Sequence, residues 1–124
     1  MLAKRVLIVD DDADIRDLLF SALAEDGYEG VQACDGREAL AVVERWRPDV
    51  IVLDLMMPGM DGWTFARRLR EGPLPSTIPI LVLSAAHDLG GKARAVDAAE
   101  VVSKPFDLEM LLPKIARMAG ASPT

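Results

Sequence analysis

Residues that could bind a metal ion or handle a phosphoryl group stand at the ends of short apolar runs. Asp10 and Asp11 follow the first run, Asp54 the third, Ser84 the fourth and Lys104 the last. Clustered carboxylates suit a hard divalent cation. A lysine and a hydroxyl suit the oxygens of a phosphoryl group, and a carboxylate can act as its covalent acceptor. These residue types therefore predict metal-assisted phosphoryl transfer, provided that the chain brings them together.

Hydrophobic periodicity indicates which elements would carry these residues. Continuous apolar or β-branched runs predict strands, at residues 6–9, 28–33, 50–53, 78–83 and 101–102. Between them, apolar residues recur at helical spacing and are bounded by Asp, Gly and Pro. These segments predict helices that start near residues 14, 36, 62, 92 and 107. The chain is therefore expected to contain five consecutive βα units.

Runs that are apolar throughout, rather than alternating with polar residues, are typical of parallel strands covered by helices on both faces. Right-handed crossovers then favour an α/β fold of the flavodoxin-like, doubly wound type, (βα)5, with the parallel five-stranded sheet in the order 2-1-3-4-5. All strand carboxyl ends would lie along one edge, with the switch point between strands one and three. Asp10, Asp11 and Asp54 would then lie side by side. Three close carboxylates need a cation, and Mg²⁺ fits such a set of oxygen ligands.

Composition limits the classes of function. The 124 residues include 20 acidic and 14 basic ones, a net charge of −6, which disfavours direct binding to nucleic acid or an anionic membrane. No apolar run approaches the roughly 18 residues of a membrane span, and no secretory signal is evident. We expect a cytoplasmic chain forming one domain over residues 1–124, with residues 120–124 as a frayed tail. The single cysteine, Cys34, is expected to be buried or half-buried.

Four motifs give the chain a resemblance to a known family. They are Leu7 to Asp12, Asp54 to Gly62, Ser84-Ala85 and Lys104 to Phe106. In this order, and at strand ends, they resemble the receiver domain of two-component response regulators over nearly the whole chain.

The resemblance implies a magnesium site and a role in phosphoryl transfer. Asp11 and Asp54 would bind Mg²⁺ directly, together with the backbone carbonyl of Met56, and Asp10 would act mainly through water. Asp54 would accept a phosphoryl group from a sensor histidine kinase or a phosphotransfer protein. The domain would then switch the face formed by helix 4, strand 5 and helix 5 toward an output partner whose identity is unknown. It would be a monomer or a weak homodimer, and not an enzyme beyond its self-catalysed phosphorylation and slow autodephosphorylation.

The same resemblance assigns roles to the other polar residues. Lys104 would hold a phosphoryl oxygen, or pair with Asp54 beforehand, and Ser84 would move toward the phosphoryl group. The bond between Lys104 and Pro105 is expected to be cis, which proline makes affordable.

The chain departs from the family pattern at several positions. Val101 stands where family members usually carry an aromatic residue, so we expect switching through helix 4, near residues 92–98, rather than through a ring rotation. Pro113 falls inside the last helix, which should kink there or restart. Met56 and Ala86, two residues beyond the acceptor and the serine, cannot orient a water molecule, and this predicts slow loss of the phosphoryl group.

Two other functions remain open at this level. A haloacid-dehalogenase-like phosphatase would use Asp10 as nucleophile, with Asp12 two residues on, although Asp14 stands where that motif wants Thr or Val. A non-phosphorylated pseudo-receiver would serve as a binding module, but it should have lost part of the acidic pair, the acceptor or the lysine. Asp12 and Asp14 are expected mainly to cap the first helix, where acidic residues stabilise the positive end of the helix dipole.

Overall fold

The computed structural model describes residues 3–72, 77–85 and 97–120. Five strands lie in this part of the chain: β1 Arg5–Val9, β2 Glu29–Ala33, β3 Val50–Asp54, β4 Ile80–Ala85 and β5 Glu100–Lys104. Its α-helices are α1 Ala13–Glu25, α2 Gly36–Arg45, α3 Gly62–Glu71 and α5 Leu108–Met118. The helix expected near residues 92–98 falls almost wholly outside the described residues, as does Ala86.

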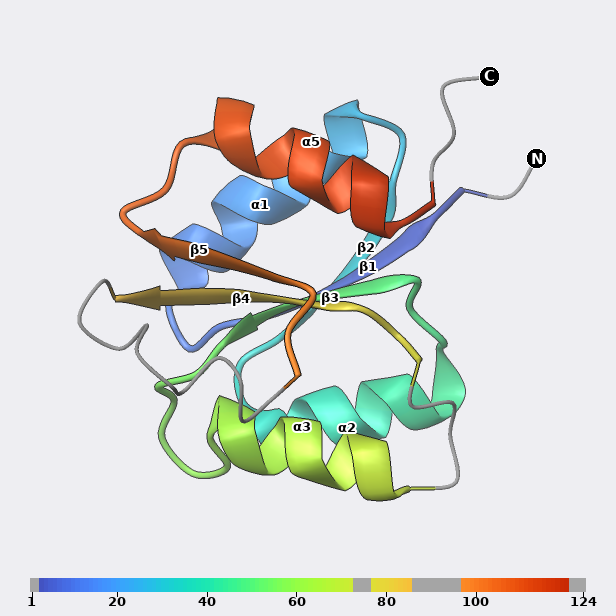
Figure 1. The fold of residues 1–124 in the computed structure, drawn as a ribbon, viewed down its shortest axis with the longest axis vertical. Coiled ribbons are helices and arrows are strands. Elements are labelled where there is room, and N and C mark those ends of the chain that lie inside the picture. Colours follow the sequence, from blue (N-terminus) through green and yellow to red (C-terminus); the bar gives the residue numbers. More distant parts are fainter. Residues whose placement is uncertain (1–2, 73–76, 86–96, 121–124) are drawn as a thin grey trace.

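The strands form one parallel sheet in the order β2-β1-β3-β4-β5. Helices α1 and α5 cover one face of the sheet, and α2 and α3 cover the other (Figure 1). This is the predicted flavodoxin-like arrangement. Every strand runs in the same direction, so all carboxyl ends meet at one edge.

The central strands are apolar throughout because both of their faces are buried. Val6 and Ile8 of β1 pack in the cluster that contains the buried residues of α1 and α5. The alternate residues, Leu7 and Val9, pack in the cluster on the other face with α2 and α3. Since side chains alternate across a strand, any polar residue within such a run would enter one of the two cores. Polar chemistry is therefore confined to the strand ends.

An aspartate stands as the N-cap residue directly before each of the four described helices. The carboxylates of these N-cap residues accept hydrogen bonds from backbone N–H groups of the first turn, at distances of 2.8 to 2.9 Å. Such caps satisfy donors that the helix itself leaves free. The four residues are Asp12, Asp35, Asp61 and Asp107. The capping role expected for Asp12 is confirmed.

Two local expectations need correction. Strand β4 begins at Ile80 rather than at residue 78 and continues through Ser84 to Ala85. Pro79 has no N–H to donate, so the ladder with β3 starts at the following residue. Cys34 is exposed, because it lies just beyond the end of β2 and not within the strand.

Pro113 lies in the middle of one helix, and no new helix begins there. Helix α5 runs from Leu108 to Met118 across it. Proline cannot donate to the carbonyl of Glu109, four residues earlier. Both residues are exposed, so water can reach that carbonyl, while Leu111 and Ile115 on the other side hold the helix against the core.

Replacing Pro113 by Ala should therefore stabilise the domain. Alanine restores a helical hydrogen bond and removes the clash of the ring, and we expect a gain of about 1–3 kcal/mol in the free energy of unfolding. Urea denaturation measures this value. The same change at Pro48, which is buried after the end of α2, should lower stability instead. A Pro113→Ala variant no more stable than the parent would contradict the explanation.

Candidate functional site

The polar residues at the strand ends meet in one pocket, as the strand order predicts. The ammonium group of Lys104, at the end of β5, lies 3.0 Å from a carboxylate oxygen of Asp10 and 3.6 Å from one of Asp54. Asp10 follows β1 and Asp54 ends β3. A cavity of about 270 Å³ opens here. Its lining residues are Asp10, Asp11, Asp12, Asp54, Met56, Ala85 and Lys104.

Three carboxylates form the acidic side of the pocket. Oxygen atoms of Asp10, Asp11 and Asp54 all lie within 4.8 Å of one another. Asp10 and Asp54 are buried, whereas Asp11 is exposed. One lysine cannot neutralise three carboxylates, so the pocket keeps an excess of negative charge. Oxygen ligands at this density fit a hard divalent cation such as Mg²⁺.

The charge balance shifts the pKa values of the buried groups. Burial, followed by the negative charge of Asp10, raises the pKa of Asp54 to about 7. The charge of Lys104 and a hydrogen bond from the N–H of Met56 act in the opposite direction. Burial alone would lower the pKa of Lys104, but the hydrogen bond and charge of Asp10, with the charge of Asp54, raise it. Lys104 is therefore a permanent cation in the pocket.

Asp10 is the better paired of the two buried carboxylates. One of its oxygens accepts a hydrogen bond from Lys104, and the other accepts one from the backbone N–H of Asp12 at 2.9 Å. Pairing with Asp54 was one of the two roles expected for Lys104, and this ion pair is present at 3.6 Å, although the contact of Lys104 with Asp10 is shorter. As a result Asp54 keeps the weaker contacts and remains the carboxylate with more freedom to react.

Ser84 supplies a buried hydroxyl near this edge of the sheet. It lies in β4, one residue beyond Leu83, which is the register partner of Asp54. Its Oγ is buried and has no hydrogen-bond partner among the described residues. The next residue, Ala85, and not Ser84 itself, lines the cavity. A buried hydroxyl without a partner is costly, so this group fits a site completed by a ligand.

Glycine at position 62 is required by the close approach of the loop after β3. A Cβ atom there would lie 2.6 Å from the carbonyl oxygen of Asp54 and 2.8 Å from the Cα of Leu55. The N–H of Gly62 donates to the carbonyl of Leu55 at 3.0 Å. Together with the N-cap Asp61 of α3, this hydrogen bond fixes the main chain between Asp54 and Met56. The carbonyl of Met56 as a metal ligand stays a prediction.

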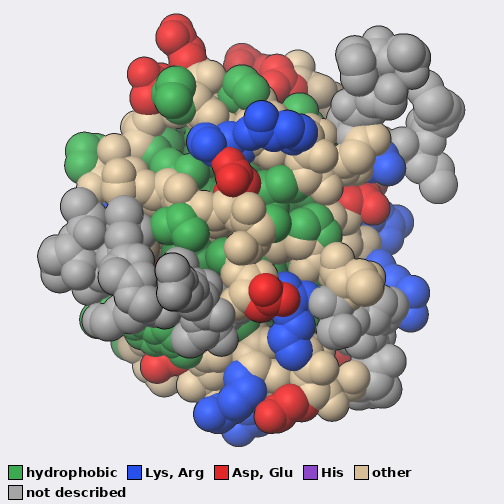
Figure 2. All heavy atoms as spheres, in the orientation of Figure 1, with side chains coloured by type: hydrophobic (Ala, Val, Ile, Leu, Met, Phe, Trp, Pro, Cys, Tyr) green, Lys and Arg blue, Asp and Glu red, His purple; other side chains and the backbone are tan. Residues whose placement is uncertain are grey.

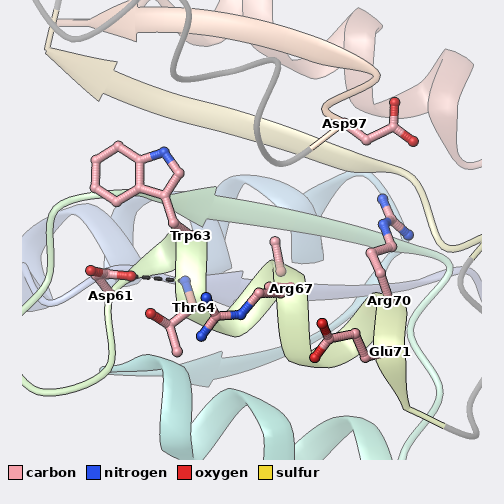
Figure 3. A pocket seen from close by; sticks show the side chains of 8 residues that line it. Asp61, Trp63, Thr64, Arg67, Arg70, Glu71 and Asp97 are labelled. Carbon is pink, nitrogen blue, oxygen red and sulfur yellow. Dashed lines mark hydrogen bonds between the residues drawn. The ribbon is translucent and has the colours of Figure 1, made fainter.

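A second and larger hollow lies along α3, away from the acidic pocket. It measures about 440 Å³ and is lined by side chains of α3 together with Asp61 and Asp97. Figure 3 shows the carboxylates of Asp97 and Glu71 near the same end of this hollow as Arg70, with Trp63 at the opposite end. Its charges are mixed, and the three-carboxylate group found among the described residues is not here. The acidic pocket is therefore the site for the predicted chemistry.

Sequence reasoning missed two residues of the pocket wall. Asp12 was assigned to the helix cap alone, but it caps α1 and also lines the cavity. Ala85 carries no chemical signal in the sequence, and only the extension of β4 past Ser84 places it in the wall.

A parallel sheet that gathers carboxylates and a lysine at its switch point defines a class of phosphate-handling α/β domains. Residues 6–116 match the family described as response regulator receiver domain. The curated relative RpaA of Synechocystis, a DNA-binding dual master transcriptional regulator, is 40% identical over 113 residues, covering 90% of this chain and 47% of RpaA. The chain thus spans about half the length of that relative.

Solved structures agree with the family match. The chemotaxis protein CheY4 of Vibrio cholerae is 37% identical, with a TM-score of 0.85 and coverage of 94% of this chain and 99% of CheY4. The response regulator TrrA of Thermotoga maritima, solved in complex with Mg²⁺-BeF, is 34% identical, with a TM-score of 0.81 and coverage of 93% and 98%. The chain belongs to the response regulator receiver domain family.

This membership disfavours both alternative functions. In a haloacid-dehalogenase-like phosphatase, Asp10 would be the nucleophile, but here it is occupied by Lys104 and the N–H of Asp12. A pseudo-receiver should lack part of the acidic set or the lysine, and here the carboxylates and Lys104 lie together.

The burial of Asp54 and its repulsion by Asp10 should be measurable as a pH-dependent loss of stability. The pKa of folded Asp54 is raised above its unfolded value, so the folded state binds the extra proton. Stability should therefore fall as the pH rises from about 4 through 7. In EDTA at pH 8 we expect Asp54→Asn to raise the free energy of unfolding by about 1–3 kcal/mol and to flatten this pH dependence.

Urea denaturation in EDTA at pH 6 and pH 8 provides the measurement. Asp26→Asn is a matched control, because Asp26 is exposed beyond the end of α1, and it should leave the pH dependence unchanged. An Asp54→Asn variant less stable than the parent at pH 8 would mean that the contact with Lys104 outweighs the repulsion.

Proposed function

We propose that this domain receives a phosphoryl group on Asp54 in a Mg²⁺-dependent reaction, as part of two-component signalling. The observation that carries the proposal is the position of Lys104, whose ammonium group lies within 4 Å of both buried carboxylates at the switch point of the sheet. Of those two, Asp54 has the weaker contacts. It is the last residue of β3 and lines the cavity.

In the transfer step, a carboxylate oxygen of Asp54 forms a bond to phosphorus while the bond between phosphorus and the donor breaks. The product is an aspartyl phosphate, and the donor leaves with its bonding electron pair. Lys104 provides a fixed positive charge for the oxygens of the transferred group. The hydroxyl of Ser84, which has no partner among the described residues, is available as a further donor.

The pocket fits Mg²⁺ as the group that completes this site. Asp11 and Asp54 would hold the ion directly with the carbonyl of Met56, and Asp10 mainly through water. The ion would supply positive charge opposite Lys104, and its presence would favour the ionised form of Asp54. The presence of Mg²⁺-BeF in the related TrrA supports this assignment.

The phosphoryl donor would be a sensor histidine kinase or a phosphotransfer protein, because these are the partners of receiver domains. The response would reach an output partner through the face that contains β5 and α5. Val101 lies on β5 with 37% of its surface exposed, and an aliphatic side chain has no ring to rotate. We therefore propose that switching does not depend on a ring rotation at residue 101; the segment expected to switch instead, near residues 92–98, lies almost wholly outside the described residues.

The charge of the chain supports a protein partner rather than nucleic acid or an anionic membrane surface. The net charge is −6, and on the face drawn in Figure 2 acidic and basic side chains are interspersed among hydrophobic ones. None of the described helices is long and apolar enough to cross a membrane. The domain would act as a monomer or a weak homodimer.

Incubation with a small acyl phosphate and Mg²⁺ tests the assignment. Intact mass spectrometry should show the addition of one phosphoryl group. Reduction of the aspartyl phosphate on the protein, followed by peptide mapping, should place this group on residue 54. Asp54→Ala and EDTA should each reduce labelling by at least about a hundredfold. A label on Asp10 would support phosphatase-like chemistry instead.

The rim of the pocket predicts a long-lived phosphoryl group. Met56 is 55% exposed at this rim, and its thioether is too weak an acceptor to orient a water molecule. Met56→Asn would place an amide there and should speed spontaneous dephosphorylation by roughly three- to tenfold.

Decay of the labelled protein, followed by mass spectrometry after removal of the donor, gives the rate. Met110→Asn makes the same change at a methionine of α5 that is 63% exposed and does not line the pocket, and it should leave the rate unaltered. Equal decay in the two variants would show that water is positioned by other groups.

A further inference from the structure

An arginine of α1 holds the main chain of the first acidic residue from behind the pocket. The Nη1 atom of Arg16 donates to the backbone carbonyl of Asp10 at 2.7 Å. The backbone N–H of Asp10 donates to the carbonyl of Ala33, the last residue of β2, at 3.2 Å. Since the two carboxylate oxygens are bonded to Lys104 and the N–H of Asp12, every polar atom of Asp10 has a partner. The peptide bond that leads into Asp11 is thus held at its carbonyl by Arg16, and the peptide bond before it is held at its N–H by Ala33.

The guanidinium group of Arg16 is itself oriented by β2. Its Nε donates to the side-chain oxygen of Gln32 at 3.1 Å, and the amide nitrogen of Gln32 donates to Asp17 at 3.3 Å. A guanidinium only donates and a carboxylate only accepts. Only one orientation of the Gln32 amide therefore satisfies both neighbours, and this orientation fixes the direction of the arginine fork.

These contacts serve no helix cap and no strand ladder. Arg16 and Gln32 are half-buried, and neither lines the acidic cavity. What they share is the carbonyl of Asp10, at the junction between β1 and the loop that presents Asp11. A rotation of this peptide would move the exposed carboxylate of Asp11 relative to the two buried ones, which are held by other contacts.

We propose that Arg16, oriented by Gln32, is a positioning residue that fixes the peptide between Asp10 and Asp11 for divalent-cation binding. The proposal rests on the function proposed above. It makes Arg16 an outer partner of the metal site, acting through the main chain without touching the ion or the phosphoryl group. Outer partners of this kind strongly influence metal affinity.

Electrostatics makes the proposal easy to distinguish from a simple charge effect. Arg16 is a cation close to an acidic site, so its removal by Coulomb interaction alone would tighten the binding of Mg²⁺. Loss of positioning would weaken it. The two roles predict opposite signs for the same substitution.

The test is the dissociation constant of Mg²⁺ alone, measured by isothermal titration calorimetry on the whole chain. Arg16→Met should weaken binding about tenfold, and Arg16→Lys, which keeps the charge but not the fork, about threefold. Gln32→Ala should also weaken it about threefold, and adding this change to Arg16→Met should have little further effect, because both act through one contact.

Arg45→Met is the matched control. Arg45 also donates through Nη1 to a backbone carbonyl, that of Ala41 at 3.1 Å, but this carbonyl lies within α2, outside the pocket. Its loss should leave Mg²⁺ affinity within about twofold of the parent, a limit well below the effect expected for an outer partner. Urea unfolding in EDTA shows whether each variant is folded, and Arg16→Lys and Gln32→Ala carry the test if Arg16→Met is not.

Phosphorylation by a small acyl phosphate gives a second measurement. Arg16→Met should raise the Mg²⁺ concentration needed for half-maximal rate while nearly preserving the maximal rate. Unchanged or tighter Mg²⁺ binding in Arg16→Met and Arg16→Lys would overturn the proposal and leave the function of Asp54 standing. A parent protein that neither binds Mg²⁺ nor takes label on Asp54 would overturn both.

Discussion

The interaction on which the structure of this site depends is the ion pair between Lys104 and two buried carboxylates. Asp10 and Asp54 are 1% and 4% exposed, and such groups are tolerated inside a protein only with a partner. One lysine offsets part of their charge, but burial, followed by the negative charge of Asp10, still raises the pKa of Asp54. The pocket therefore keeps an excess of negative charge at the edge of the sheet, and this charge favours the binding of a cation there.

The sequence was sufficient to predict the sheet order and the meeting of the site residues. Runs that are apolar throughout allow only parallel, doubly covered strands, and the polar residue that ends each run then has one place to go. The nearer pairing of Lys104 with Asp10 was not predictable, because it depends on differences of a few tenths of an ångström. The contact of Arg16 with the carbonyl of Asp10 was missed for a related reason: main-chain acceptors leave no trace in the pattern of side chains.

The acidity of the chain divides into two physical roles. Some aspartates complete the first turns of helices, where each satisfies backbone donors at its own site. Others are clustered without enough countercharge, and their mutual repulsion is available for binding. Asp12 takes part in both, since it caps α1 and lines the pocket. Composition alone gives only the total charge, so a net charge of −6 disfavours nucleic acid and anionic membranes as partners but does not locate a site.

The hydrogen bond between Lys104 and Asp10 joins residues 94 positions apart in the chain. The residues that line the pocket follow or end four different strands, so these strands must be aligned before the complete pocket exists. The pocket then forms in the same cooperative event as the folded sheet. A chain that ended before β5 would lack Lys104, and the two buried carboxylates would then be left without their lysine partner.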